Sequence, residues 1–96
     1  MIDFLIISGI KKETIDEINK NTSHAFNLNC NKDDCVEIIK FLKLIGINNI
    51  DDLLLYKTKL FYKTKEEISY LFSKHNTSQL VDQINEDFEN IELLFN

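Results

Sequence analysis

Proline is absent from this chain of 96 residues, and glycine occurs only twice, at Gly9 and Gly46. β-Hairpins and β-sandwiches depend on these two residue types for their tight turns. No stretch alternates apolar and polar residues between turn signals, as a half-buried strand would. We therefore expect residues 1–96 to form a single all-α domain, either whole or one piece of a longer helical-repeat protein.

Arginine is absent as well. All eleven basic residues are lysines, against sixteen acidic residues, and the formal net charge is −5. Arginine supplies the planar fork that grips phosphates and guanine edges at two points at once. Its absence and the negative charge disfavour nucleic-acid binding without forbidding it.

Long apolar runs are also missing. No stretch reaches the roughly 18 apolar residues that a membrane-spanning helix requires. The apolar run after Met1 contains Asp3 and lacks the basic leader of a signal peptide. Two cysteines, Cys30 and Cys35, fit reduced thiols at least as well as a disulfide. We expect a cytoplasmic protein with no membrane partner.

Motifs that carry chemistry are scarce. Cys30 and Cys35 lie at the outer limit of the spacing for a zinc-binding pair, but no second tight pair accompanies them. His24 and His75 stand in no catalytic motif. Both are expected near helix ends, and a protonated imidazole at a helix C-terminus interacts favourably with the helix dipole. No glycine-rich loop is available to hold a phosphate. The sequence predicts no enzyme activity, no metal and no cofactor.

A repeated pattern is present instead. An isoleucine is followed two residues later by an aromatic residue and then by leucine, with a helix-ending position four residues beyond. The pattern occurs in three places, at residues 2–9, 39–46 and 68–75. An acidic stretch with apolar residues at helical spacing follows each, at residues 15–18, 50–53 and 81–84. The sequence therefore predicts about six short helices in three helix–turn–helix repeats, as a compact bundle or a short αα-superhelix.

Capping signals place the first helices. The first helix covers about residues 2–8. Thr14 followed by Glu17 matches a capping box, in which each of the two residues satisfies a free backbone amide of the other, and predicts a second helix to about His24.

The third helix is expected between Asn31, paired with Asp34 as its cap, and Gly46, where a left-handed glycine would end it. It is apolar nearly all round and is therefore expected at the centre of the domain. Its apolar residues are Ile38, Ile39, Phe41, Leu42, Leu44 and Ile45.

Three more helices follow. Asn48 or Asn49 opens the fourth, Thr64 with Glu67 opens the fifth, and the sixth runs from about Ser78 almost to the C-terminus. The sixth carries one continuous apolar stripe, formed by Val81, Ile84, Phe88, Ile91 and Phe95. This stripe fits either a coiled-coil seam or, more simply, the core of the domain.

Charge is segregated in the second half of the chain. Lysines alternate with aromatic residues before the fifth helix, with no acidic residue among them: Tyr56, Lys57, Lys59, Tyr62, Lys63 and Lys65. These side chains fit either phosphates and stacked bases or a solvated rim. The last helix has five acidic residues and no lysine: Asp82, Glu86, Asp87, Glu89 and Glu92. It fits either a solvated outer face or a docking surface for a basic partner.

A family resemblance rests on five segments in the middle of the chain. They are Ile39-Lys40-Phe41-Leu42, Gly46-Ile47, Ile50-Asp51-Asp52-Leu53-Leu54, Tyr56-Lys57-Thr58-Lys59-Leu60-Phe61 and Thr64-Lys65-Glu66-Glu67-Ile68. Together, residues 39–68 resemble one repeat of the mitochondrial transcription termination factor family. The resemblance implies an all-α superhelix of units of about thirty residues that grips nucleic acid. The family's usual proline at the position of Thr58 and its arginine-rich surface are missing, so the resemblance bears on architecture more than on function.

The sequence therefore predicts a non-enzymatic protein–protein interaction module that presents its acidic helix or its apolar stripe to another protein. The alternative is a nucleic-acid-binding helical-repeat module that uses the lysine and aromatic residues of segment 56–65. Net charge and the lack of arginine favour the first.

Overall fold

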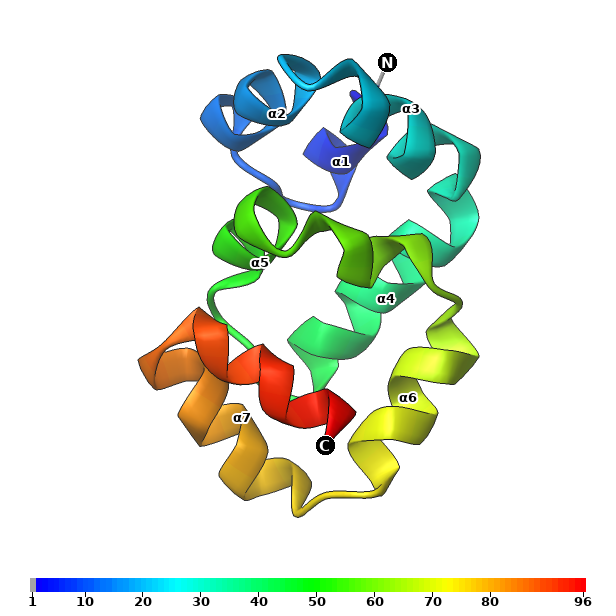
Figure 1. Ribbon diagram of the computed structural model, residues 1–96. Coiled ribbons are helices and arrows are strands. Elements are labelled where there is room, and N and C mark those ends of the chain that lie inside the picture. The colour runs from blue at the N-terminus through cyan, green and yellow to red at the C-terminus, as the bar shows by residue number, and fades with distance from the viewer. Residues whose placement is uncertain (1) are drawn as a thin grey trace.

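The computed structural model describes residues 2–96, which form seven α-helices and two 3-10 helices and no strand (Figure 1). The α-helices are α1 (Phe4–Ile7), α2 (Lys12–Asn19), α3 (Thr22–Cys30), α4 (Lys32–Leu44), α5 (Ile50–Tyr56), α6 (Lys65–Ser73) and α7 (Thr77–Glu86). The 3-10 helices are η1 (Thr58–Tyr62) and η2 (Phe88–Phe95). The predicted all-α class is confirmed, with more and shorter helices than the six expected.

A glycine in the left-handed conformation ends two of the helices. Gly46 follows α4 with φ 103°, and Gly9 follows α1 with φ 86°. Beyond Gly46 the amide of Ile47 donates to the carbonyl oxygen of Leu42 at 2.9 Å, the long-range bond of a Schellman cap. Glycine adopts a positive φ without steric cost, so the predicted end of the third helix at Gly46 is confirmed.

The start of α2 is capped by another helix. The helix begins at Lys12, so Thr14 lies inside it and is buried. The hydroxyl of Thr14 donates to the carboxylate of Asp51 in α5 at 2.8 Å, and the same oxygen accepts the amide of Lys11 at 3.0 Å. The predicted capping box of Thr14 and Glu17 is wrong, because a carboxylate from α5 satisfies the end of α2.

The predicted second helix is divided into α2 and α3. The break falls at Asn21, whose side chain caps α3 by accepting the amide of His24 at 3.1 Å. His24 therefore lies in the first turn of α3. The expected position at a helix C-terminus, where the helix dipole would favour a protonated imidazole, is wrong.

The start of α4 is tied to a distant segment. Asn31 precedes the helix, as predicted, but its side-chain amide donates to the carbonyl oxygens of Phe61 at 2.8 Å and Lys63 at 2.9 Å. The carboxylate of Asp34 accepts the amide of Lys65 at 3.0 Å. The predicted capping box is therefore wrong, since both side chains hold the connection between η1 and α6.

The predicted last helix is also divided. Asp87 has an extended backbone, with φ −154° and ψ 117°, and its carboxylate accepts the amide of Glu89 at 2.9 Å to open η2. The chain reverses there, and η2 packs back against α7 (Figure 1). Ile84 on α7 and Ile91 on η2 are both buried, whereas Phe95 is 46% exposed. The apolar stripe exists, but it lies on two helices that face each other.

The start of α6 agrees with the sequence. Thr64 accepts the amide of Glu67 at 3.1 Å, as predicted for this cap. The helix η1 was not predicted; it fills the connection in which the lysine and aromatic residues lie.

The core is continuous, and α4 runs through its middle between α3, η1, α5 and α6 (Figure 1). Its inward face is fully buried, although Leu44 at its end is 85% exposed, contrary to prediction. The radius of gyration is 12.6 Å, close to the ~13 Å of a compact 100-residue domain. Among the helices of residues 2–96, none is long and apolar enough to cross a membrane.

Candidate functional site

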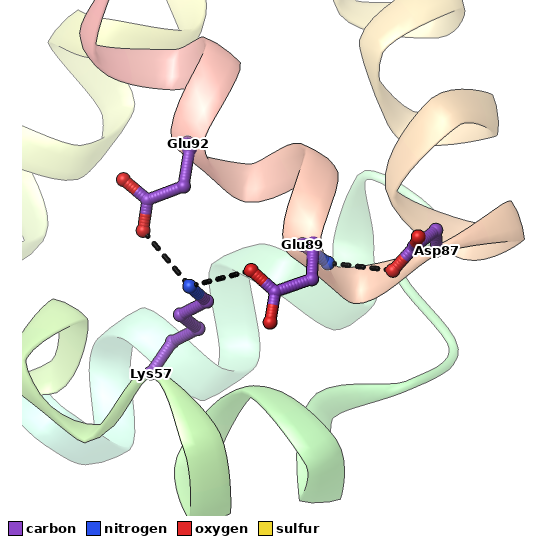
Figure 2. A network of polar contacts seen from close by, with 4 residues as sticks. All are labelled: Lys57, Asp87, Glu89 and Glu92. Carbon is purple, nitrogen blue, oxygen red and sulfur yellow. Dashed lines mark hydrogen bonds and ion pairs between the residues drawn. The ribbon is translucent and has the colours of Figure 1, made fainter.

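The basic segment and the acidic segment of the sequence meet in space. Lys57 follows the end of α5, and its Nζ lies 2.8 Å from a carboxylate oxygen of Glu89 and 3.1 Å from one of Glu92 (Figure 2). Glu89 and Glu92 are three residues apart, and in a 3-10 helix this spacing puts both side chains on one side. Part of each predicted site therefore meets the other, joined by Lys57.

Lys57 is the most enclosed member of this cluster. Its side chain is 21% exposed, against 59% for Glu89 and 63% for Glu92. Hydrogen bonds to Glu89 and Glu92 raise the pKa of Lys57 above its ordinary value. Lys57 is therefore charged and already paired, and an outside anion would have to displace two carboxylates to bind it.

A groove of about 350 Å³ opens beside this ion pair, between η1 and η2. Lys59 and Leu60 of η1 line one side, and Ile91 and Phe95 of η2 line the other. His24 of α3 lies at the groove as well. We call this the η1–η2 groove; it joins residues from α3, α5, η1 and η2, which lie in three distant parts of the sequence.

Two lysines of the groove have no acidic partner. Within residues 2–96, neither Lys59 nor Lys63 forms an ion pair. Lys59 is exposed, and Lys63 Nζ lies 5.6 Å from the centre of the Phe95 ring, in a cation–π arrangement. The groove therefore offers two unpaired cations next to an apolar surface.

Aromatic rings lie at the edge of the groove. Tyr56 is 61% exposed and stacks on Phe88 with ring centres 5.2 Å apart and planes at 18°. Tyr62, half-buried on η1, faces His24 edge-on at 6.4 Å and does not line the groove. Burial raises the pKa of Tyr62, which keeps its phenol neutral.

Other predicted residues lie apart from the groove. Lys65 begins α6, and its Nζ lies 5.9 Å from the centre of the Phe41 ring. Asp82 and Glu86 are exposed on α7, and Asp87 caps η2. Of the five acidic residues, Glu89 and Glu92 bind Lys57, whereas the other three lie apart from this ion pair.

The groove also includes residues that the sequence did not single out. The sequence places His24 near a helix end and gives Leu60 only as part of the family resemblance. Each lies on a helix whose own sequence carries no sign of the η1–η2 contact. The sequence did single out two parts of the groove, three lysines and Tyr56 of segment 56–65 and the end of the apolar stripe at Phe95.

The cysteines and the second histidine have structural surroundings. Cys35 is buried, and burial raises its pKa to about 12, whereas Cys30 is exposed. His75 Nε2 lies 3.2 Å from the carbonyl oxygen of Leu94 and links the end of α6 to η2. The described part of the chain holds no group of three His, Cys, Asp or Glu side chains placed to bind a metal.

Comparison of the chain with protein-family models, with curated proteins and with solved structures gives no match. The resemblance of residues 39–68 to a family repeat therefore stays a prediction.

Proposed function

We propose that this chain is a non-enzymatic protein–protein interaction module, and that its η1–η2 groove binds a segment of another protein. The observation that carries the proposal is an open groove of about 350 Å³ with apolar walls, charges of both signs and the exposed ring of Phe95. Binding sites are typically concave, mostly apolar and supplied with a few fixed polar groups. Aromatic residues are enriched where proteins meet.

The charges of the groove support a protein partner over a nucleic acid. Nucleic-acid affinity comes mainly from lysine and arginine side chains that neutralise phosphates. Here Lys57 is paired with Glu89 and Glu92, and Glu92 itself lines the groove. Only Lys59 and Lys63 remain to neutralise phosphates, whereas a protein segment can also place an apolar side chain against Phe95.

Nucleic-acid binding by residues 56–65 is the second candidate, and one observation favours it. Lys59 and Lys63 are unpaired and line the same groove as the exposed Tyr56. The test is a titration with labelled single-stranded RNA and duplex DNA at low and physiological salt. Binding whose logarithm falls linearly with log salt, and which Lys59→Ala and Lys63→Ala weaken, would favour this candidate; no binding at low salt would eliminate it.

We also propose that the chain consists of three repeated units, each with two α-helices followed by a third helix, which is an α-helix in the first unit and a 3-10 helix in the other two. The order α1-α2-α3, α4-α5-η1 and α6-α7-η2 supports this division. So do Gly9 and Gly46, which occupy the same turn with positive φ in the first two units. The third helices of all three units contribute residues to the groove, namely His24, Lys59 and Phe95. A repeat would explain why the groove runs along them.

Site-specific photo-crosslinking in cells of the source organism tests the proposed function. A benzophenone-bearing phenylalanine replaces Phe95 at the groove or, as the control, Tyr70, which is 60% exposed on α6 and does not line it. We expect a protease-sensitive adduct from position 95 and none of that mass from position 70. Equal adducts from both positions, or a nuclease-sensitive adduct from position 95, would contradict the proposal.

A further inference from the structure

The charge of the groove differs in sign from the charge of the whole chain. The chain carries a net charge of −5, yet three lysines and one glutamate line the groove. Lys57 is bound to both Glu92 and the neighbouring Glu89, so this cluster carries a net charge of −1, and the two unpaired lysines, Lys59 and Lys63, bring the region to a net charge of +1. At physiological salt, charges beyond about 8 Å are largely screened. A ligand in the groove therefore meets a local positive field.

An apolar surface lies directly beside these cations. Leu60 and Ile91 are buried at 5% and 1% exposure and form the floor, while Phe95 remains 46% exposed. Lys63 Nζ sits 5.6 Å from the centre of the Phe95 ring, so the cation and the apolar side wall are adjacent. A ligand that covers Phe95 would place its next polar group near Lys63.

We propose that the groove binds an acidic segment of a partner protein in which two carboxylates flank one large apolar side chain. The carboxylates pair with Lys59 and Lys63, and the apolar side chain covers Leu60, Ile91 and Phe95. The inference rests on the proposed function and adds the chemistry of the partner, which is opposite to the basic partner expected for the acidic residues of the sequence. Charge complementarity selects this occupant, since a basic segment would bring cations next to two unpaired lysines.

Fluorescence anisotropy with three labelled peptides tests the inference. The peptides have the same uncharged flanking residues and carry Glu-Leu-Glu, Lys-Leu-Lys or Glu-Gly-Glu at the centre. We expect the Glu-Leu-Glu peptide to bind, the Lys-Leu-Lys peptide not to bind, and loss of leucine to weaken binding at least about tenfold. Preference for Lys-Leu-Lys, or equal binding with and without leucine, would overturn the inference.

Two double variants with the same change in net charge locate the binding site. Lys59→Glu with Lys63→Glu reverses the charge of the groove, and Lys12→Glu with Lys32→Glu is the control. Lys12 and Lys32 are exposed in the first turns of α2 and α4, where glutamate suits the helix dipole. We expect the groove variant to lose at least about tenfold in affinity for Glu-Leu-Glu and to bind Lys-Leu-Lys, with the control unchanged. Equal loss in both variants would overturn the inference.

A second groove variant, and the comparison of peptide binding with crosslinking, distinguish a folding defect and a wrong ligand from a wrong function. If the groove variant does not fold, as judged by circular dichroism, Lys59→Gln with Lys63→Gln replaces it and should still weaken binding of Glu-Leu-Glu. If no peptide binds the wild-type chain while position 95 still crosslinks to a protein, the acidic ligand is refuted and the proposed function stands. If the crosslink is absent as well, both fail. Displacement of the peptide by single-stranded RNA would assign the groove to nucleic acid and overturn the inference.

Discussion

Lys57 Nζ lies 2.8 Å from a carboxylate oxygen of Glu89, which joins the end of α5 to η2. With eight residues, η2 is longer than the three or four residues usual for a 3-10 helix, whose hydrogen bonds have poorer geometry than those of an α-helix. Such a helix depends on its contacts with the rest of the protein. Lys57 supplies two of them, because it also binds Glu92. The same ion pairs border the groove, so the shape of the groove depends on them.

Replacing Lys57 with methionine should lower the melting temperature at low salt, and the difference from the wild type should shrink in 1 M NaCl. The reason is that salt screens ion pairs, with a Debye length of about 3 Å at 1 M. Lys40→Met, which removes an exposed pair with Glu37 at 3.5 Å, is the control and should change little in either condition. A difference that does not depend on salt would mean that Lys57 acts through packing of its aliphatic chain.

The pH dependence of this contribution has a definite sign. Hydrogen bonds to Glu89 and Glu92 raise the pKa of Lys57 in the folded state above the ordinary 10.5. The ion pairs therefore stabilise the fold fully below pH 10.5, and their contribution is lost as the pH rises through the raised pKa. Thermal melts of the wild type and Lys57→Met should converge at high pH. A gap that stays constant would contradict the ion-pair account.

Asp51 should be important for stability because it satisfies two donors of α2. Asp51→Ala leaves the amide of Lys11 and the hydroxyl of Thr14 without their acceptor, and should cost about 1–3 kcal/mol of the free energy of unfolding. Asp52 is the matched control, since it lies in the same first turn of α5 and is exposed. Asp52→Ala should cost less than about 0.5 kcal/mol in urea denaturation. Equal losses would show that the charge at the start of α5 matters, and the bonds to α2 do not.

Cys35 should weaken the fold at alkaline pH. Burial raises its pKa to about 12 from the ordinary 9.0, so above pH 9.0 the unfolded chain releases a proton that the folded chain keeps. The free energy of unfolding should fall by up to about 1.4 kcal/mol per pH unit from this group. Cys35→Ala should remove that part of the slope, whereas Cys30→Ala, at an exposed thiol, should leave it. Identical slopes in the two variants would refute the assignment.

The sequence predicted those features that depend on neighbouring residues. The end of α4 at Gly46 and the cap of α6 at Thr64 are both local, because a glycine or a hydroxyl acts on the backbone within one turn. The capping bonds of Asp51 and Asn31 could not be predicted in this way. Each satisfies backbone groups of another part of the chain, and such a partner is known only once the helices have packed.

The same distinction applies to the groove. The lysine and aromatic segment and the acidic residues were each visible in the sequence, but their meeting through Lys57 depends on the reversal of the chain at Asp87. The apolar stripe predicts one straight helix because helical periodicity shows which face is buried. The periodicity does not show where the helix ends. Ile84 and Ile91 keep the pattern on both sides of the break, since both point into the core.

The break between α7 and η2 should depend on Asp87. Asp87 opens η2 by accepting the amide of Glu89, and Asp87→Ala removes this cap. The variant should lose about 1 kcal/mol of stability. It should also show a stronger α-helical circular dichroism signal, because alanine favours continuation of α7 through the stripe. Glu86→Ala, one residue earlier, removes a neighbouring carboxylate that makes no capping bond, and it should keep both the stability and the spectrum of the wild type because glutamate already favours a helix. An unchanged spectrum in Asp87→Ala would mean that packing of η2 against α7 fixes the reversal, and that the cap only adds to it.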